Sequence, residues 1–150
     1  MIRLLRAAIR REGGQSLVEF SLVSIVFFLL VFGTIDVGRA VWNYNTLAQA
    51  TREGTRYAIV HGADSADPSG PGSAYYTPPD TDTNVTQVVE THAAGLNTTQ
   101  LTVQAQWPNG TNSDGDPVTV TSQYTYQPIF NFLGLLSFTM SSSSTMNITN

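Results

Sequence analysis

The residue whose chemistry stands out in this sequence is Glu19, a carboxylate just inside an otherwise apolar stretch. After Glu19 the chain carries no charged residue until Asp36. An acid near the centre of a membrane helix costs about 2.5–3.5 kcal/mol, and less near the helix end, so such a residue is normally kept for a task. The task need not be catalytic, because a carboxylate that is costly without a partner penalises misregistered helices.

The remaining reactive side chains do not form a catalytic pattern. His61 and His92 are the only imidazoles, and neither has the spacing of a zinc site or of a nucleophile triad. The serines at 141–144 lack the G-x-S-x-G surroundings of a nucleophile elbow and fit alternating strand positions. The sequence therefore predicts no enzyme, no catalytic residue and no cofactor.

A possible calcium loop is the third chemical feature. Asn112, Asp114 and Asp116 alternate as metal ligands do, but Pro117 stands where an EF-hand requires glycine and no acid follows at the twelfth position. A polar hairpin loop is the preferred interpretation, and calcium binding by these three residues stays open.

The charges divide the chain into a basic beginning and an acidic remainder. Arg3, Arg6, Arg10 and Arg11 precede the apolar run, and every formal charge after Arg56 is negative. Basic flanks stay on the cytoplasmic side of a membrane, so the amino-terminal end is expected there. An acidic remainder without Lys or Arg cannot neutralise phosphates, which excludes nucleic acid as a partner.

The apolar run predicts one membrane span over about residues 17–41, because about 20 apolar helical residues cross a bilayer core of about 30 Å. Asp36 and Arg39 lie on one helical face, and Trp42 and Tyr44 are amphipathic aromatics of the kind found at interfaces. With Arg10 and Arg11 on the other side, these residues are predicted to mark the membrane boundaries.

A cleaved secretory signal is the alternative to a retained span, since small residues precede a possible cut after Ala40. The apolar run is longer than the usual signal core of about 7–15 residues. Glu19, Asp36 and Arg39 also fit such a signal poorly. The retained span is therefore preferred.

The elements that must position Glu19 follow from periodicity. The helical pattern continues past the membrane to residue 61, and a loop rich in Gly, Pro, Asp and Ser follows over 62–82. A short second helix is predicted at 83–94, and period-two alternation predicts three strands at 101–107, 118–126 and 138–148. The apolar segment 129–136 is expected to plug the core between sheet and helix. The predicted fold is α+β: a long helix followed by a small head with a short helix and a three-stranded antiparallel sheet.

The amino-terminal residues resemble a class III, type IV pilin-like signal: Arg10 and Arg11, Gly14 at a cut site, Glu19 as the fifth residue afterwards, and Phe20 beside it. Within that class, the helix segment from Thr51 to Ala58 and the final strand around residues 143–146 resemble TadE-like minor pilins of tight-adherence (Flp/Tad) pili. Related pilins often carry Tyr where this chain has Phe20.

The resemblance implies that a prepilin peptidase cuts between Gly14 and Gln15. A cytoplasmic leader, residues 1–14, would be removed from a helix of residues 15–61 and an exported head of residues 62–150. It implies three kinds of partner: the peptidase, other pilin-like subunits, and the assembly platform of the inner membrane. It also implies that Glu19, with Phe20, sets register by meeting the free amino terminus of a neighbouring subunit.

Simpler interpretations of the same residues stay open. Glu19 could sit at the headgroup boundary and reach water, and Gly14 could be a flexible hinge. The chain could also be a signal-anchored exported binding or adhesion module that never enters a pilus. The mature amino terminus separates the hypotheses, because Gln15 is expected for a pilin, and Val41 or Met1 for the alternatives.

Overall fold

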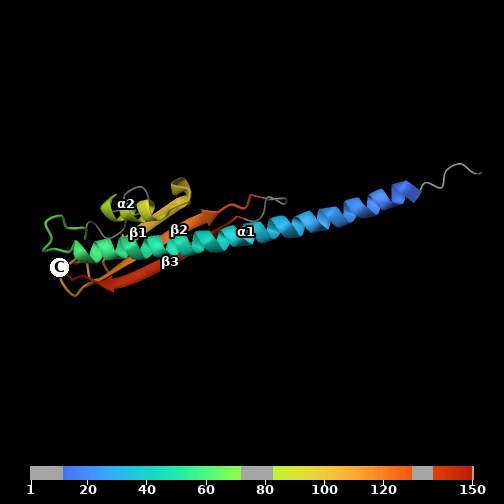
Figure 1. The fold of residues 1–150 in the computed structure, drawn as a ribbon. Coiled ribbons are helices and arrows are strands. Elements are labelled where there is room, and N and C mark those ends of the chain that lie inside the picture. Colours follow the sequence, from blue (N-terminus) through green and yellow to red (C-terminus); the bar gives the residue numbers. More distant parts are fainter. Residues whose placement is uncertain (1–11, 72–82, 130–136, 150) are drawn as a thin grey trace, which may run out of the picture.

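The computed structural model describes residues 12–71, 83–129 and 137–149. The elements are α1 (Glu12–Val60), α2 (Thr83–His92), a 3₁₀ turn η1 (Thr98–Gln100), β1 (Leu101–Gln106), β2 (Pro117–Tyr126) and β3 (Phe138–Asn147). The carboxyl-terminal half of α1 lies along the head, and its amino-terminal half projects from it (Figure 1). The predicted pilin-like α+β fold is confirmed.

The sheet is antiparallel with the strand order β1-β2-β3. The residues of β2 and β3 pair one to one from Pro117 opposite Asn147 to Tyr126 opposite Phe138. Side chains that alternate along the strands line the core, while the other face carries Thr, Ser, Gln and Asn. On that face, hydroxyl pairs join β2 to β3, at 2.8 Å between Thr119 and Thr145 and at 3.1 Å between Thr121 and Ser143.

The core forms where α1 packs on β2 and β3 while α2 packs on α1 and β1. Its buried apolar residues come from every one of these elements: Leu47, Ala50 and Ala58 of α1, Val85 and Val89 of α2, and Val103, Val118, Val120, Tyr124, Tyr126 and Met140 of the strands. The end of α1 is tied to the end of the sheet, because the backbone N–H of Thr149 donates to the carbonyl of Ile59 at 3.0 Å.

The observed ends of the long helix differ from the predicted ends by a few residues. The long helix begins at Glu12, inside the predicted leader, and ends at Val60, before Gly62. Of the segment 129–136, only Ile129 is described, and its side chain is exposed. The predicted core plug at 130–136 lies outside the described residues.

Candidate functional site

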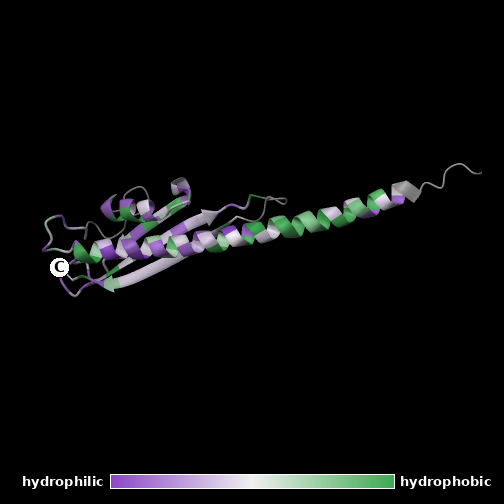
Figure 2. Ribbon diagram, in the orientation of Figure 1, coloured by the Kyte–Doolittle hydropathy of each residue, from purple (hydrophilic) through white to green (hydrophobic). Residues whose placement is uncertain are grey.

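The amino-terminal half of α1, which projects from the head (Figure 1), carries Gly14, Gln15, Glu19 and Phe20 of the predicted site residues. Its apolar side chains are more than half exposed at most positions from Leu17 to Leu30, and Figure 2 shows the hydrophobic stretch extending beyond the head. One helix of the described residues, Gly14–Val60, is long and apolar enough to cross a membrane, and its most apolar window has no buried share. This half of the helix is compatible with a single membrane anchor.

Glu19 lies one turn after Gln15 on this exposed helix. The Gln15 side-chain amide donates a hydrogen bond of 3.0 Å from Nε2 to the Glu19 carboxylate at Oε1. Phe20 is 71% exposed, and a side chain at Gly14 would meet nothing within 4 Å. The structure therefore places the two residues of the predicted cut, the acid and Phe20 on two successive helical turns that other molecules can reach. Arg10 and Arg11 lie outside the described residues.

Asp36 forms the junction between the exposed helix and the head. The Tyr126 hydroxyl donates to the Asp36 carbonyl oxygen at 2.9 Å and approaches Oδ1 at 3.4 Å. The backbone N–H of Ile129 donates to Oδ1 at 3.1 Å, and Arg39 forms an ion pair with the same oxygen at 3.5 Å. Asp36 thus fixes the end of β2 to α1, which sequence spacing could not reveal because the partners are 90 and 93 residues away.

The environment of Tyr126 follows from this junction. Its side chain is buried, and the Arg39 guanidinium carbon lies 5.8 Å from the ring centroid. Burial raises the pKa of the Tyr126 phenol, the positive charge of Arg39 opposes that change, and the negative charge of Asp36 adds to it. The hydroxyl therefore stays protonated and acts as a donor to Asp36.

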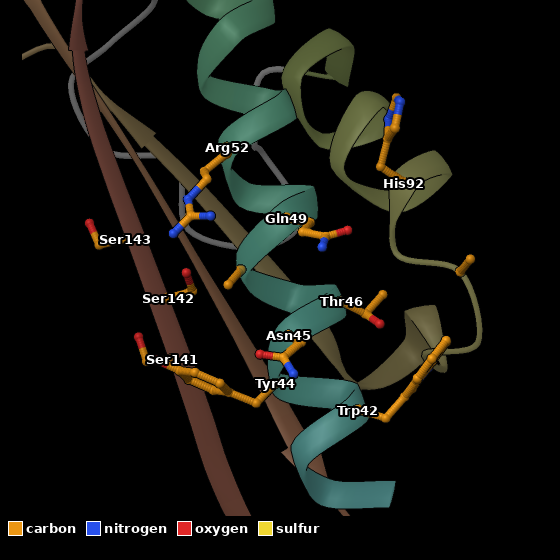
Figure 3. Close-up of a pocket in the computed structure, with 12 residues that line it drawn as sticks. Trp42, Tyr44, Asn45, Thr46, Gln49, Arg52, His92, Ser141, Ser142 and Ser143 are labelled. Atoms are coloured by element: carbon orange, nitrogen blue, oxygen red, sulfur yellow. The ribbon is translucent and has the colours of Figure 1, made fainter.

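Trp42 and Tyr44, the predicted interface aromatics, lie on opposite sides of α1. Tyr44 points toward Ser141 of β3, whereas Trp42 lies on the side of Thr46 and α2 (Figure 3). They are 67% and 50% exposed, respectively. The surface between them is an open hollow of about 750 Å³ that α1 divides, and Arg52 and His92 are among the residues that line it. No acid is among its lining residues, and Ser141, Ser142 and Ser143 of β3 lie across α1 from His92 (Figure 3).

The segment near residues 51–58, which resembles TadE-like proteins, packs closely against α2. A Cβ on Gly54 would come within 2.4 Å of Val89 Cγ2, so only glycine lets α2 approach α1 this closely. Thr51 and Thr55 are fully buried, and their hydroxyls donate to the carbonyls of Leu47 and Thr51 at 2.7 and 2.9 Å. These contacts give the segment a structural explanation that does not require catalysis.

The histidines cap helix ends. Nδ1 of His61 lies 2.8 Å from the Tyr57 carbonyl oxygen, and Nδ1 of His92 lies 2.8 Å from the Val88 carbonyl oxygen. With its proton on Nδ1, each ring donates to a carbonyl one turn earlier in the chain. Among residues 12–71, 83–129 and 137–149, neither ring is hydrogen-bonded to a carboxylate.

The residues of the possible calcium loop have different hydrogen-bond partners. Asn112 is buried and donates to the Gly70 carbonyl at 2.7 Å, joining the β1–β2 loop to the loop after α1. Asp116 accepts from Asn109 at 2.9 Å and from the Thr111 hydroxyl. These two hydrogen bonds, with that of Thr111 the stronger influence, lower the pKa of Asp116. No group of three or more potential metal ligands forms among residues 12–71, 83–129 and 137–149.

The comparisons with known proteins agree with the geometry of α1. No curated protein and no solved structure matches the chain significantly. A family model described as TadE-like protein matches residues 14–56, from the predicted cleavage glycine through the exposed half of α1 to the glycine-mediated contact with α2. Over this segment, residues 14–56, the chain is similar to the TadE-like protein family.

Proposed function

We propose that this chain is a minor pilin or pseudopilin that a prepilin peptidase processes and that acts in the assembly of a Tad-type pilus. The observation that carries the proposal is the continuous helix α1, whose exposed half holds Glu19 and whose other half is fixed to the head. A subunit of this shape can be drawn from a membrane into a helical bundle without refolding, because removing the exposed half breaks no core contact.

The cut between Gly14 and Gln15 would fall within the first turns of α1. A peptidase needs an extended backbone at the scissile bond, so this end of the helix must unwind. Gly13 and Gly14 favour unwinding, since glycine in a helix is about 1 kcal/mol less favourable than alanine. Arg10 and Arg11 would hold the leader on the cytoplasmic side of the membrane.

The role proposed for Glu19, with Phe20 beside it, is to set the register between subunits. In the isolated chain Gln15 already satisfies one carboxylate oxygen. After cleavage, Gln15 would be the first residue of every subunit and would carry its free amino group. The Glu19 carboxylate of one subunit would then bind both its own Gln15 side chain and the amino terminus of a neighbouring subunit. A charged pair of this kind in a low-dielectric bundle stabilises the correct register mainly by making misregistered arrangements costly.

The junction at Asp36 supports a membrane span that ends earlier than the predicted residue 41. Residues 14–35 of α1 extend about 33 Å at about 1.5 Å per residue, which matches a hydrocarbon core of about 30 Å. The head would then begin at Asp36 on the outer side, with Trp42 and Tyr44 one to two turns further out. Prepilin peptidase, other pilin-like subunits and the inner-membrane assembly platform are the proposed partners, and the proposed role is structural.

The mature amino terminus tests this function. We expect the protein isolated from native membranes to start at Gln15. A Gly14→Leu variant should keep its leader and fail to assemble, whereas the matched Gly13→Ala variant should still be cut. Peptide mass spectrometry of the terminal peptide identifies the first residue of the mature protein. A terminus at Val41, or an intact Met1 beside an active peptidase, would refute processing as a pilin.

A further inference from the structure

Two apolar side chains are exposed at the end of the head that faces the projecting half of α1. Ile129 follows β2 and is 60% exposed, and Phe138 begins β3 and is 50% exposed. We call these two residues the basal edge of the head. The core cluster does not include either residue, so the fold leaves half or more of each side chain exposed.

Contacts to Asp36 fix the level of the basal edge along α1. The backbone N–H of Ile129 donates to Asp36 Oδ1 at 3.1 Å. Phe138 pairs with Tyr126 in the sheet, their ring centroids are 5.3 Å apart, and the Tyr126 hydroxyl donates to the Asp36 carbonyl at 2.9 Å. Both apolar side chains therefore lie level with the residue that follows Ile35, the last residue of the exposed apolar run.

The charges around the basal edge favour an uncharged apolar partner. Residues 117–149, which include β2 and β3, contain no Asp, Glu, Lys or Arg. At the level of the edge, Asp36 and Arg39 pair with each other at 3.5 Å and so bring no net charge. An anionic surface or a charged peptide would find nothing complementary here, whereas the boundary between lipid headgroups and acyl chains requires only apolar and aromatic groups.

We propose that the basal edge rests on the bilayer that α1 spans, with Ile129 and Phe138 inserted at the boundary between headgroups and acyl chains. The inference rests on the membrane span of the proposed function, and it does not depend on cleavage or pilus assembly. If α1 crosses the hydrocarbon with residues 14–35, the headgroup layer begins at the level of Asp36, where these side chains lie. Figures 1 and 2 show this end of the head beside the start of the long hydrophobic stretch of α1.

A second point of lipid contact has a mechanical consequence. A head held only by one helix can turn about the helix axis, whereas contact at an off-axis edge fixes its rotation and tilt. Because the edge is apolar, its contact with lipid is expected to be insensitive to salt and to the fraction of anionic lipid. The head would thus meet its partners in one orientation and leave the bilayer by releasing a small apolar contact.

The absence of cysteine makes a direct test possible, since a single introduced cysteine carries the only label. Four variants, Ile129→Cys, Phe138→Cys, Asn147→Cys and Phe28→Cys, are labelled with an environment-sensitive fluorophore in full-length protein. Each is placed at one copy per nanodisc of phosphatidylcholine. Asn147 is the matched control, because it is exposed at the far end of the strand that Phe138 begins. Phe28 reports on the span itself.

We expect shallow lipid-attached spin labels to quench positions 129 and 138 several-fold more than position 147, and aqueous iodide to show the reverse order. Quenching at 129 and 138 that equals the value at 147, in discs where position 28 is quenched, overturns the lipid contact. Protection of positions 129 and 138 from iodide that appears only with two copies per disc also overturns the lipid contact, because it indicates a contact between subunits. If position 28 is not quenched by lipid, the membrane span of the proposed function fails instead. The two basal positions are independent, so a folding defect in one leaves the other decisive.

Discussion

At the scale of single residues, Glu19 is distinguished by a neighbour that the sequence alone did not connect to it. Gln15 donates to its carboxylate at 3.0 Å, so loss of charge and loss of hydrogen bonding can be separated. We expect Glu19→Gln and Glu19→Ala both to be cut, to insert into the membrane and to assemble poorly, because neither can pair with an amino terminus. Gln15→Ala keeps the charge and should assemble. Leader removal on immunoblots and recovery in sheared pili measure the two steps, and normal assembly of Glu19→Gln would contradict the register argument.

Tyr126 offers a residue-scale prediction with a pH dependence. Burial raises its pKa, so the folded state favours the neutral phenol. This contribution to the free energy of unfolding is complete below about pH 10, the ordinary pKa of the phenol in the unfolded chain. It is lost as the pH rises through the higher pKa of the phenol in the folded protein. Tyr126→Phe should lower the free energy of unfolding by about 1 kcal/mol at neutral pH through loss of the bond to Asp36, measured by urea unfolding. Ultraviolet titration should show one late phenolate step that this variant lacks. An unchanged titration would remove Tyr126 as its source.

At the scale of elements, Gly54 determines how closely α1 and α2 pack. A Cβ there would lie 2.4 Å from Val89 Cγ2, whereas one on Gly38 would meet nothing within 4 Å. Alanine gains about 1 kcal/mol of helix propensity at either site, but overpacking costs about 1–3 kcal/mol. Gly54→Ala should therefore lower the unfolding temperature of the head, and Gly38→Ala should raise it slightly. Adding Val89→Ala to the Gly54→Ala variant should restore part of the lost unfolding temperature, because it removes the atom that the new Cβ would meet. Thermal unfolding followed by circular dichroism compares them, and equal effects of the two glycine substitutions would argue against the close contact.

The elements were predictable from sequence because each has a single period. Strict alternation located β1, β2 and β3 to within about two residues, and α2 also begins where predicted. The buried face of α1 was less predictable. Helical spacing in the sequence links Val37, Val41, Tyr44 and Ala48, yet Val37 and Val41 are exposed. Leu47 and Ala50 lie outside that pattern and are buried. A helix packed by a sheet on one side and α2 on another buries a wider face than a one-stripe pattern describes.

At the scale of the whole molecule, the sequence indicated an anchor and a head but not the contacts that join them. Asp36 was predicted to be a membrane-boundary charge because it stands beside Arg39 three residues later. Its decisive partners, Tyr126 and Ile129, come from the other end of the chain. Spacing along a helix cannot reveal contacts across 90 residues, so the sequence could suggest candidate site residues in the first turns of α1 but not the junction.

The position of this junction predicts how the chain can be shortened. All core residues follow Asp36, so a protein that begins at residue 34 should keep the head stability of the full chain and need no detergent for folding. A protein that begins at residue 41 loses Asp36 together with Arg39, which leaves the Tyr126 hydroxyl and the Ile129 amide without the Asp36 oxygens that accept from them. Its free energy of unfolding should be lower by about 1–3 kcal/mol, the cost of unsatisfied polar groups. Urea unfolding of the two proteins measures the difference. Equal stability would return the boundary to residue 41, because the head would then hold together without the turn of α1 that carries Asp36.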